Sequence, residues 1–215
     1  MGGAGVQFAL AVFHLRRRRC LLCMKVDRVS SRHLPGEPGI WILILGDLVL
    51  FSLLFILLLI YRADNLPVFA ASQAQLSQPL GLLNTLFMLT SSWCVANGIQ
   101  ATRRQVPRLA AACFGSAWLC GLGFIVVKYV EYGAKIAAGI TPVTNTFFMF
   151  YFVCTGIHLI HVVFGMGVLT AIFLHSRRGE FSARKIQHFE SGASFWHLVD
   201  LLWIVLFALL YLLVY

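Results

Sequence analysis

Hydrophobic residues dominate five long stretches of this chain, and charged residues are concentrated in the segments between them. The stretches are residues 40–61, 80–100, 109–130, 146–174 and 193–215. Each has about the twenty residues or more that an α-helix needs to cross the hydrocarbon core of a bilayer. Backbone polar groups in that core must bond within the protein, and stretches of this length are too long for barrel strands. The pattern therefore predicts an all-α polytopic membrane protein, a bundle of five transmembrane helices.

Proline marks the start of four of these stretches. Pro38, Pro79, Pro107 and Pro142 stand at or shortly before the first four of them. Proline is tolerated in the first turn of a helix but breaks a helix interior, so these positions support the predicted starts.

Composition agrees with the hydrophobic pattern. Of the 215 residues, 60% are hydrophobic and 12% are charged, whereas a soluble domain has roughly 25% charged residues. The net charge of +9 does not indicate a nucleic-acid partner, because the positive residues lie between the apolar stretches. Four of the six cysteines fall inside those stretches, where they act as small hydrophobic residues and not as a disulfide framework: Cys94, Cys113, Cys120 and Cys154.

The distribution of Lys and Arg predicts the orientation. Basic residues gather before the first stretch and in the connections that follow the second and the fourth stretch, whereas the other two connections hold only Arg62 and Lys135. By the positive-inside rule, the basic segments are cytoplasmic. We therefore expect a cytoplasmic N-terminus, a periplasmic C-terminus and a multi-pass location in a bacterial inner (plasma) membrane.

Two segments follow from this topology. We expect residues 1–34 to form an N-terminal cytoplasmic extension and residues 35–215 the transmembrane domain. Residues 6–15 are apolar but too short to span, and the basic run follows them, whereas in a secretory signal the charge comes first. Met24 offers an alternative start, so we interpret residues 1–23 as an unstructured or misassigned extension.

Aromatic residues near the ends of the stretches suggest interfacial belts. Trp41 and Trp196 are expected at the inner boundary, and Tyr61, Tyr129 and Tyr211 at the outer boundary.

Asp47 is an ionisable residue inside the first stretch, about 10 Å from its start by the helical rise. Such a carboxyl group is protonated, paired, or in contact with water. A neutral carboxyl that only bonds a neighbouring helix is the structural alternative, and both interpretations stay open at this point.

His158 and His161 are three residues apart in the fourth stretch, which places them on one helical face. This spacing suits one metal ion better than haem, but such a site needs further ligands, and Asp47 is a candidate only if the fold brings it close. More often such histidines bond carbonyl groups or a carboxyl group on an adjacent helix. We therefore predict no metal site, no cofactor site and no catalytic residue in this chain.

Two more pairs share this spacing of three residues. His197 and Asp200 can interact on one helix face, either as a fixed hydrogen bond or as a path for a proton. Lys128 and Glu131 lie at the outer boundary of the third stretch, where we expect Lys128 to extend outward to the carboxylate in a structural pair.

Glycines punctuate the third and fourth stretches, where they permit close helix contact: Gly115, Gly121, Gly123, Gly156, Gly165 and Gly167. The sequence has no glycine-rich phosphate loop, no Gly-x-Ser-x-Gly elbow and no His-Glu-x-x-His motif, so hydrolase and nucleotide-driven functions have no support.

Four segments together resemble the haem-copper oxidase subunit III family. They are residues 41–51, the pair Glu131-Tyr132, the run Tyr151-x-x-x-Thr155-Gly156-x-His158-x-x-His161-Val162-x-x-Gly165, and residues 196–211. The chain is similar to the five-helix form, which lacks the first two of seven helices. The resemblance implies a subunit that binds no haem or copper itself, packs against catalytic subunit I, holds phospholipid in a cleft between helix groups, and supports proton delivery and turnover. Haem, with copper or non-haem iron, is then expected in the partner subunit.

Asp47 stands where this family has a reactive intramembrane carboxylate, usually Glu. That departure, with the segment Pro35-Gly36-Glu37-x-Gly39-Ile40-Trp41, resembles the branch associated with nitric oxide reductase. The implied partner is therefore subunit I of a haem-copper oxidase or of a nitric oxide reductase.

Our hypothesis from the sequence is that Asp47 faces the fourth helix and hydrogen-bonds His161 or His158, because each polar group needs a partner in lipid. Two alternatives remain: an independent redox or metal-binding enzyme that uses the histidines, and a proton or solute transporter that uses Asp47, Asp200 and the histidines. Transporters commonly show paired repeats and broken helices, and neither is visible in this sequence. An accessory subunit explains the same residues with fewer assumptions.

Overall fold

The computed structural model describes residues 38–179 and 181–213, and the regular secondary structure of this part of the chain is entirely helical. It contains α2 (Pro38–Asp64), α3 (Leu66–Gln73), α4 (Gln78–Arg103), α5 (Pro107–Ala137), α6 (Thr146–Arg178), α7 (Ala183–Phe207) and the π-helical turn η1 (Ala208–Leu212). The expected extension of residues 1–34, with its boundary and the alternative start at Met24, lies outside the described residues.

Five of the described helices are long and apolar enough to cross a membrane, which confirms the predicted number of spans. These spans are Gly39–Asp64, Gln78–Arg103, Pro107–Ala137, Thr146–Arg178 and Ala183–Leu212. The largest differences from the predicted ends are at the end of α5 and the start of α7, where the helix continues into polar sequence. Hydropathy marks the apolar part of a helix, whereas capping groups set its ends.

Proline and capping residues explain where α4 to α7 begin and where α6 ends. Proline occupies the first turn of α4 and of α5. The Asn145 side chain accepts a hydrogen bond of 2.9 Å from the Phe148 backbone N–H at the start of α6. Gly179 ends α6 with a φ of 72°, a left-handed conformation that favours glycine, and the Ser182 side chain then caps α7.

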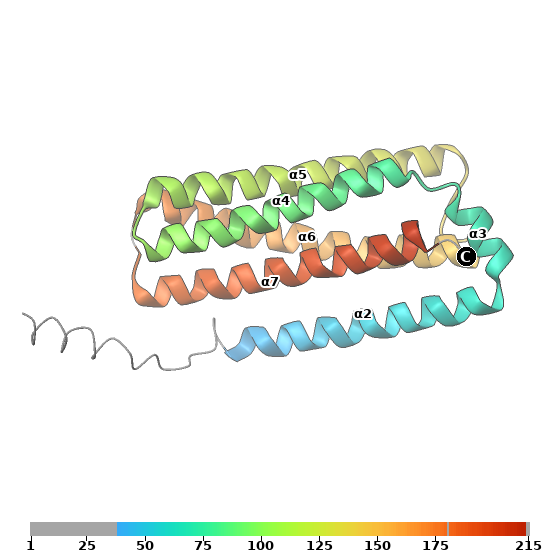
Figure 1. Cartoon of the computed structure of the whole chain (residues 1–215), viewed down its shortest axis with the longest axis horizontal. Coiled ribbons are helices and arrows are strands. Elements are labelled where there is room, and N and C mark those ends of the chain that lie inside the picture. The colour runs from blue at the N-terminus through green and yellow to red at the C-terminus, as the bar shows by residue number, and fades with distance from the viewer. Residues whose placement is uncertain (1–37, 180, 214–215) are drawn as a thin grey trace, which may run out of the picture. The chain divides into compact units, whose positions relative to one another are not determined.

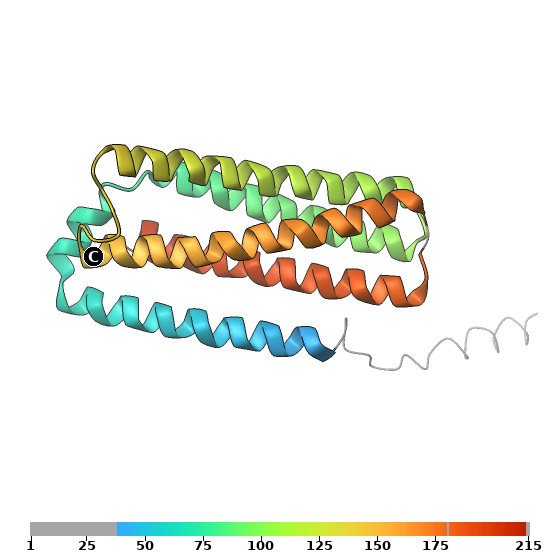
Figure 2. The same ribbon diagram turned by 180° about the vertical axis from the view of Figure 1, so that it is seen from behind.

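Helices α4, α5, α6 and α7 pack into a four-helix bundle, and α2 runs along it against α6 and α7 (Figure 1). The view from behind shows the same order, with the short helix α3 crossing one end next to α6 (Figure 2). Helix α2 thus lies on the outside of the four-helix bundle, and its polar contact with His161 of α6 defines the first candidate site below.

The two basic connections lie at the same end of the bundle. Arg103 at the end of α4 forms an ion pair of 2.8 Å with Glu190 of α7, and Gly179 lies beside Pro107. At the opposite end, Asn145 bonds Ser72 of α3 at 2.8 Å. The basic connections thus alternate with the others from end to end, as the charge pattern predicted, whereas the side of the membrane that each end faces stays a prediction.

Glycine lets the helices approach Trp196 closely. A Cβ atom on Gly165 would lie 2.6 Å from the Trp196 ring, and one on Gly121 would lie 2.5 Å from the sulfur of Met166. Gly156 and Gly167 have no such neighbour within 4 Å. The expected close contact is therefore wrong for these two positions.

The aromatic-belt prediction is wrong for Trp196 and Tyr211, which are fully buried. The indole N–H of Trp196 donates to the Ser91 hydroxyl at 3.1 Å, so its polar atom is satisfied inside the bundle. Tyr129, in contrast, is 80% exposed.

Candidate functional site

Asp47 of α2 and His161 of α6 are in contact, as predicted from the sequence. The carboxyl oxygen Oδ1 lies 3.2 Å from Nε2 of His161. The imidazole packs edge-on against Phe51, with ring centroids 5.6 Å apart. This contact joins α2 to the bundle through two polar groups that would otherwise face lipid.

The second nitrogen of His161 defines the proton arrangement of this pair. Nδ1 lies 2.8 Å from the Ile157 carbonyl oxygen, and a carbonyl only accepts, so Nδ1 carries a hydrogen. Nε2 then either accepts from a protonated Asp47 or donates, as part of an imidazolium, to a carboxylate. In both cases the pair holds one proton between Nε2 and Oδ1.

A groove of about 260 Å³ opens beside this pair. Its walls come from α2, α6 and α7, and its lining is apolar apart from the pair itself: Leu43, Asp47, Ile160, His161, Phe164 and Phe195. The other carboxyl oxygen of Asp47 is buried and has no partner among the described residues.

His158 points away from His161 and into the bundle. Its Nε2 donates to the Val199 carbonyl of α7 at 3.0 Å, and its ring lies against Phe124 and Trp203. The two histidines therefore serve different neighbours, and the alternative bond from Asp47 to His158 does not form. Among the described residues, no group of three or more His, Cys, Asp or Glu side chains is placed to hold a metal ion.

His197 and Asp200 lie on the same face of α7 and interact through Ser92 of α4. The Ser92 hydroxyl lies 2.7 Å from Nδ1 of His197, and it also interacts with the Asp200 carboxyl group. Asp200 is 5% exposed, and its Oδ1 has no partner among the described residues.

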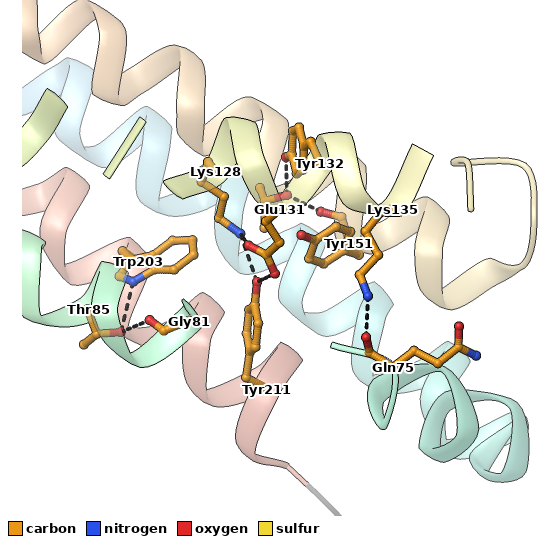
Figure 3. A network of polar contacts seen from close by, with 11 residues as sticks. Gln75, Gly81, Thr85, Lys128, Glu131, Tyr132, Lys135, Tyr151, Trp203 and Tyr211 are labelled. Carbon is orange, nitrogen blue, oxygen red and sulfur yellow. Dashed lines mark hydrogen bonds and ion pairs between the residues drawn. The ribbon is translucent and has the colours of Figure 1, made fainter. Parts of the chain in front are cut away.

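Lys128 and Glu131 form an ion pair of 2.8 Å inside the bundle, together with Tyr211 (Figure 3). The Lys128 ammonium also donates to the Tyr211 hydroxyl at 2.9 Å, and that hydroxyl donates to the other Glu131 oxygen at 2.6 Å. The ammonium lies 4.8 Å from the Trp203 ring centroid and 5.2 Å from that of Tyr151, both within the range of cation–π attraction.

The spacing of three residues correctly suggested this ion pair, but the expected outward direction of Lys128 is wrong. The two side chains are only 1% and 2% exposed. The rings of Tyr132, Tyr151 and Trp203 and the Tyr211 hydroxyl surround the ammonium. The positive charge is therefore stabilised within the protein and does not need to reach water.

Ser92 and Tyr211 are the participants that were not predicted as site residues. Serine is common and small, and no local pattern distinguishes Ser92 from other hydroxyl groups on α4. Tyr211 lies near the end of an apolar stretch, where tyrosine is typical of an interface. Both act across helices, and only the packing of α4, α5 and α7 reveals this.

Together these contacts give three groups of paired polar side chains within the spans. Each joins two or more helices, and two of them, Asp47–His161 and His197–Ser92–Asp200, have a geometry that can hold or pass a proton. What the groups do in the working protein stays a prediction.

Comparisons with known proteins match this architecture to one family. Residues 38–215 match the model of the family described as cytochrome c oxidase subunit III. A cytochrome c oxidase subunit 3 of a Synechocystis species is 31% identical over 200 residues, covering 86% of this chain and 84% of the relative. A cytochrome c oxidase subunit 3 of a Bacillus species is 26% identical, covering 81% and 84%. A probable quinol oxidase subunit 3 of Staphylococcus haemolyticus is 26% identical, covering 86% and 94%.

Proposed function

The chain belongs to the cytochrome c oxidase subunit III family, and on this basis we propose that it is the third subunit of a haem-copper oxidase in a bacterial inner membrane. In this role it packs against catalytic subunit I, carries no redox centre of its own, and supports assembly and sustained proton-coupled turnover. The observation that carries the proposal is that the family match extends over every described helix. His158 and His161, which an independent redox enzyme would use, are instead bonded to a backbone carbonyl and to Asp47.

The groove beside Asp47 and His161 is the proposed place for a bound phospholipid. Its lining is apolar, and it lies where α2 meets α6 and α7. An acyl chain in this groove would fill the space between α2 and the bundle, which stabilises the position of α2.

The chemistry of the partner is the second part of the proposal. Asp47 in place of glutamate favours the nitric oxide reductase branch, whereas the three relatives named above carry oxidase names. We propose an oxygen-reducing partner, with haem and copper in subunit I; a partner with haem and non-haem iron is the contrasting outcome of the test.

Mild-detergent purification of the tagged full chain tests the proposal directly. We expect a haem-containing catalytic subunit to co-purify, recognised by its visible spectrum, and the preparation to consume oxygen. If the preparation consumes nitric oxide instead, the partner belongs to the nitric oxide reductase branch and the proposed oxygen-reducing partner is wrong. A chain that purifies alone with its own haem or metal would refute the accessory role.

Asp47→Ala is expected to weaken assembly or shorten sustained turnover while the haem spectrum stays unchanged. The substitution leaves Nε2 of His161 without its partner and loosens α2 from the bundle. Asp47→Asn is the matched control, because its amide can still donate to Nε2. The measurements are subunit stoichiometry after purification and activity against time. Loss of the haem signal in an otherwise intact complex would contradict this expectation.

A further inference from the structure

A groove lined by both polar and apolar side chains lies on the α4–α7 face, separate from the Asp47–His161 groove. It has a volume of about 250 Å³ and lies between the Arg103–Glu190 ion pair and His197. Figure 1 shows α4 and α7 side by side along this face. The ion pair places one end of the groove at the basic end of the bundle. A space of this size has room for several water molecules, each of which takes about 30 Å³ in the liquid.

Three side chains lie one after another between this groove and the interior of the bundle. His197 lines the groove, and its Nδ1 lies 2.7 Å from the Ser92 hydroxyl. Ser92 in turn interacts with the Asp200 carboxyl group. Since Nδ1 is used by Ser92, Nε2 is the nitrogen left for the groove.

Asp200 differs from the other buried carboxyl group of the bundle in how its oxygens are satisfied. Both oxygens of Glu131 are bonded, one to Lys128 and one to Tyr211. Oδ1 of Asp200 is buried without a partner among the described residues, and the groups that act on this carboxyl are Ser92 and His197. A purely structural carboxylate in this position would be costly, because its charge has neither a full set of donors nor a dedicated cation.

We propose that Asp200 is a proton-exchange site, and that the groove, His197 and Ser92 connect it to the aqueous phase at the basic end of the bundle. In the uptake step, Nε2 of His197 gains a proton from groove water. The Nδ1 proton passes to Ser92, whose own hydroxyl proton passes to the Asp200 carboxylate. His197 and Ser92 end neutral, His197 keeps its proton on Nε2, and Asp200 holds one proton. Release follows the same steps in reverse.

Other ionisable groups of the described helices have partners outside this chain of side chains. His158 and His175 of α6 each bond a backbone carbonyl, Arg62 of α2 bonds Gln73, and three pairs form elsewhere: Lys128 with Glu131, Asp47 with His161, and Arg103 with Glu190. The exchange site therefore consists of groups contributed by α4 and α7 alone.

Infrared spectroscopy of the full chain in lipid vesicles tests the proposal, with transfer from H₂O to D₂O as the perturbation. We expect a carbonyl band of a protonated carboxyl that is missing in Asp200→Asn and that shifts in D₂O. Ser92→Ala and His197→Phe should slow this shift by about tenfold or more, because each removes one proton-transfer step. Ser194→Ala, which alters a hydroxyl in the same groove but outside the chain of bonds, is the matched control and should leave the rate unchanged.

Two results would overturn the proposal: a carboxyl band that persists unchanged in Asp200→Asn, or equal exchange rates in Ser92→Ala and Ser194→Ala. If Asp200→Asn does not fold, Asp200→Glu assigns the band by shifting it, and the comparison of the two serine variants still decides. The experiment needs no partner subunit, so its failure leaves the proposed accessory function intact.

Discussion

Glu131→Ala is expected to lower the free energy of unfolding of the helical bundle by about 3–5 kcal/mol, because it leaves the Lys128 ammonium buried without a counter-charge. Tyr211 cannot compensate for the loss, since its hydroxyl is neutral and itself donates to Glu131. The measurement is reversible unfolding of the full chain in mixed micelles, followed by circular dichroism and by the fluorescence of Trp203, whose ring faces the ammonium.

The surface pair Arg103–Glu190 is the matched control. Its arginine is 58% exposed, so Glu190→Ala should cost only about 0–1 kcal/mol. The double variant Lys128→Met with Glu131→Leu should recover most of the loss, because apolar side chains of similar volume replace both charges. If Glu131→Ala and Glu190→Ala lower the free energy of unfolding equally, burial of the Lys128–Glu131 pair does not increase the cost of removing its carboxylate.

The number and type of helices could be predicted from the sequence because a bilayer allows few alternatives. A run of apolar residues longer than a barrel strand must form a helix in lipid. The start of α7 at Ala183 was not predicted, because its first turns are polar and the Ser182 cap, not hydropathy, begins the helix. The short helix α3 was likewise not predicted, since eight residues between two spans leave little hydropathic signal.

The Asp47–His161 contact could be predicted because lipid makes an unpaired carboxyl group expensive and few partners exist within the spans. Choosing between the two histidines needed the structure. Residues three apart on a helix differ by about 60° in direction, which is enough to turn His158 to the bundle interior and His161 to α2. The same limit applies to Ser92 and Tyr211, whose roles depend on which helix faces which.

Gly165→Ala is expected to destabilise the bundle by about 2–3 kcal/mol, because overpacking a filled contact forces a shift of rings or of backbone. The added Cβ atom would lie 2.6 Å and 2.8 Å from two carbons of the Trp196 ring. That ring cannot move aside easily. Its N–H is held by Ser91 at 3.1 Å, and Gly121 of α5 faces another part of the same ring.

Gly167→Ala is the control, two residues further along the same helix. A Cβ atom at this position meets nothing within 4 Å, so the substitution should be neutral or should stabilise α6 by up to about 1 kcal/mol through helix propensity. Unfolding of both variants, together with quenching of tryptophan fluorescence, measures the difference. If Gly165→Ala unfolds like Gly167→Ala, the α6–α7 contact adapts to an extra methyl group, and the fit of Trp196 between two glycines does not determine how closely these helices pack.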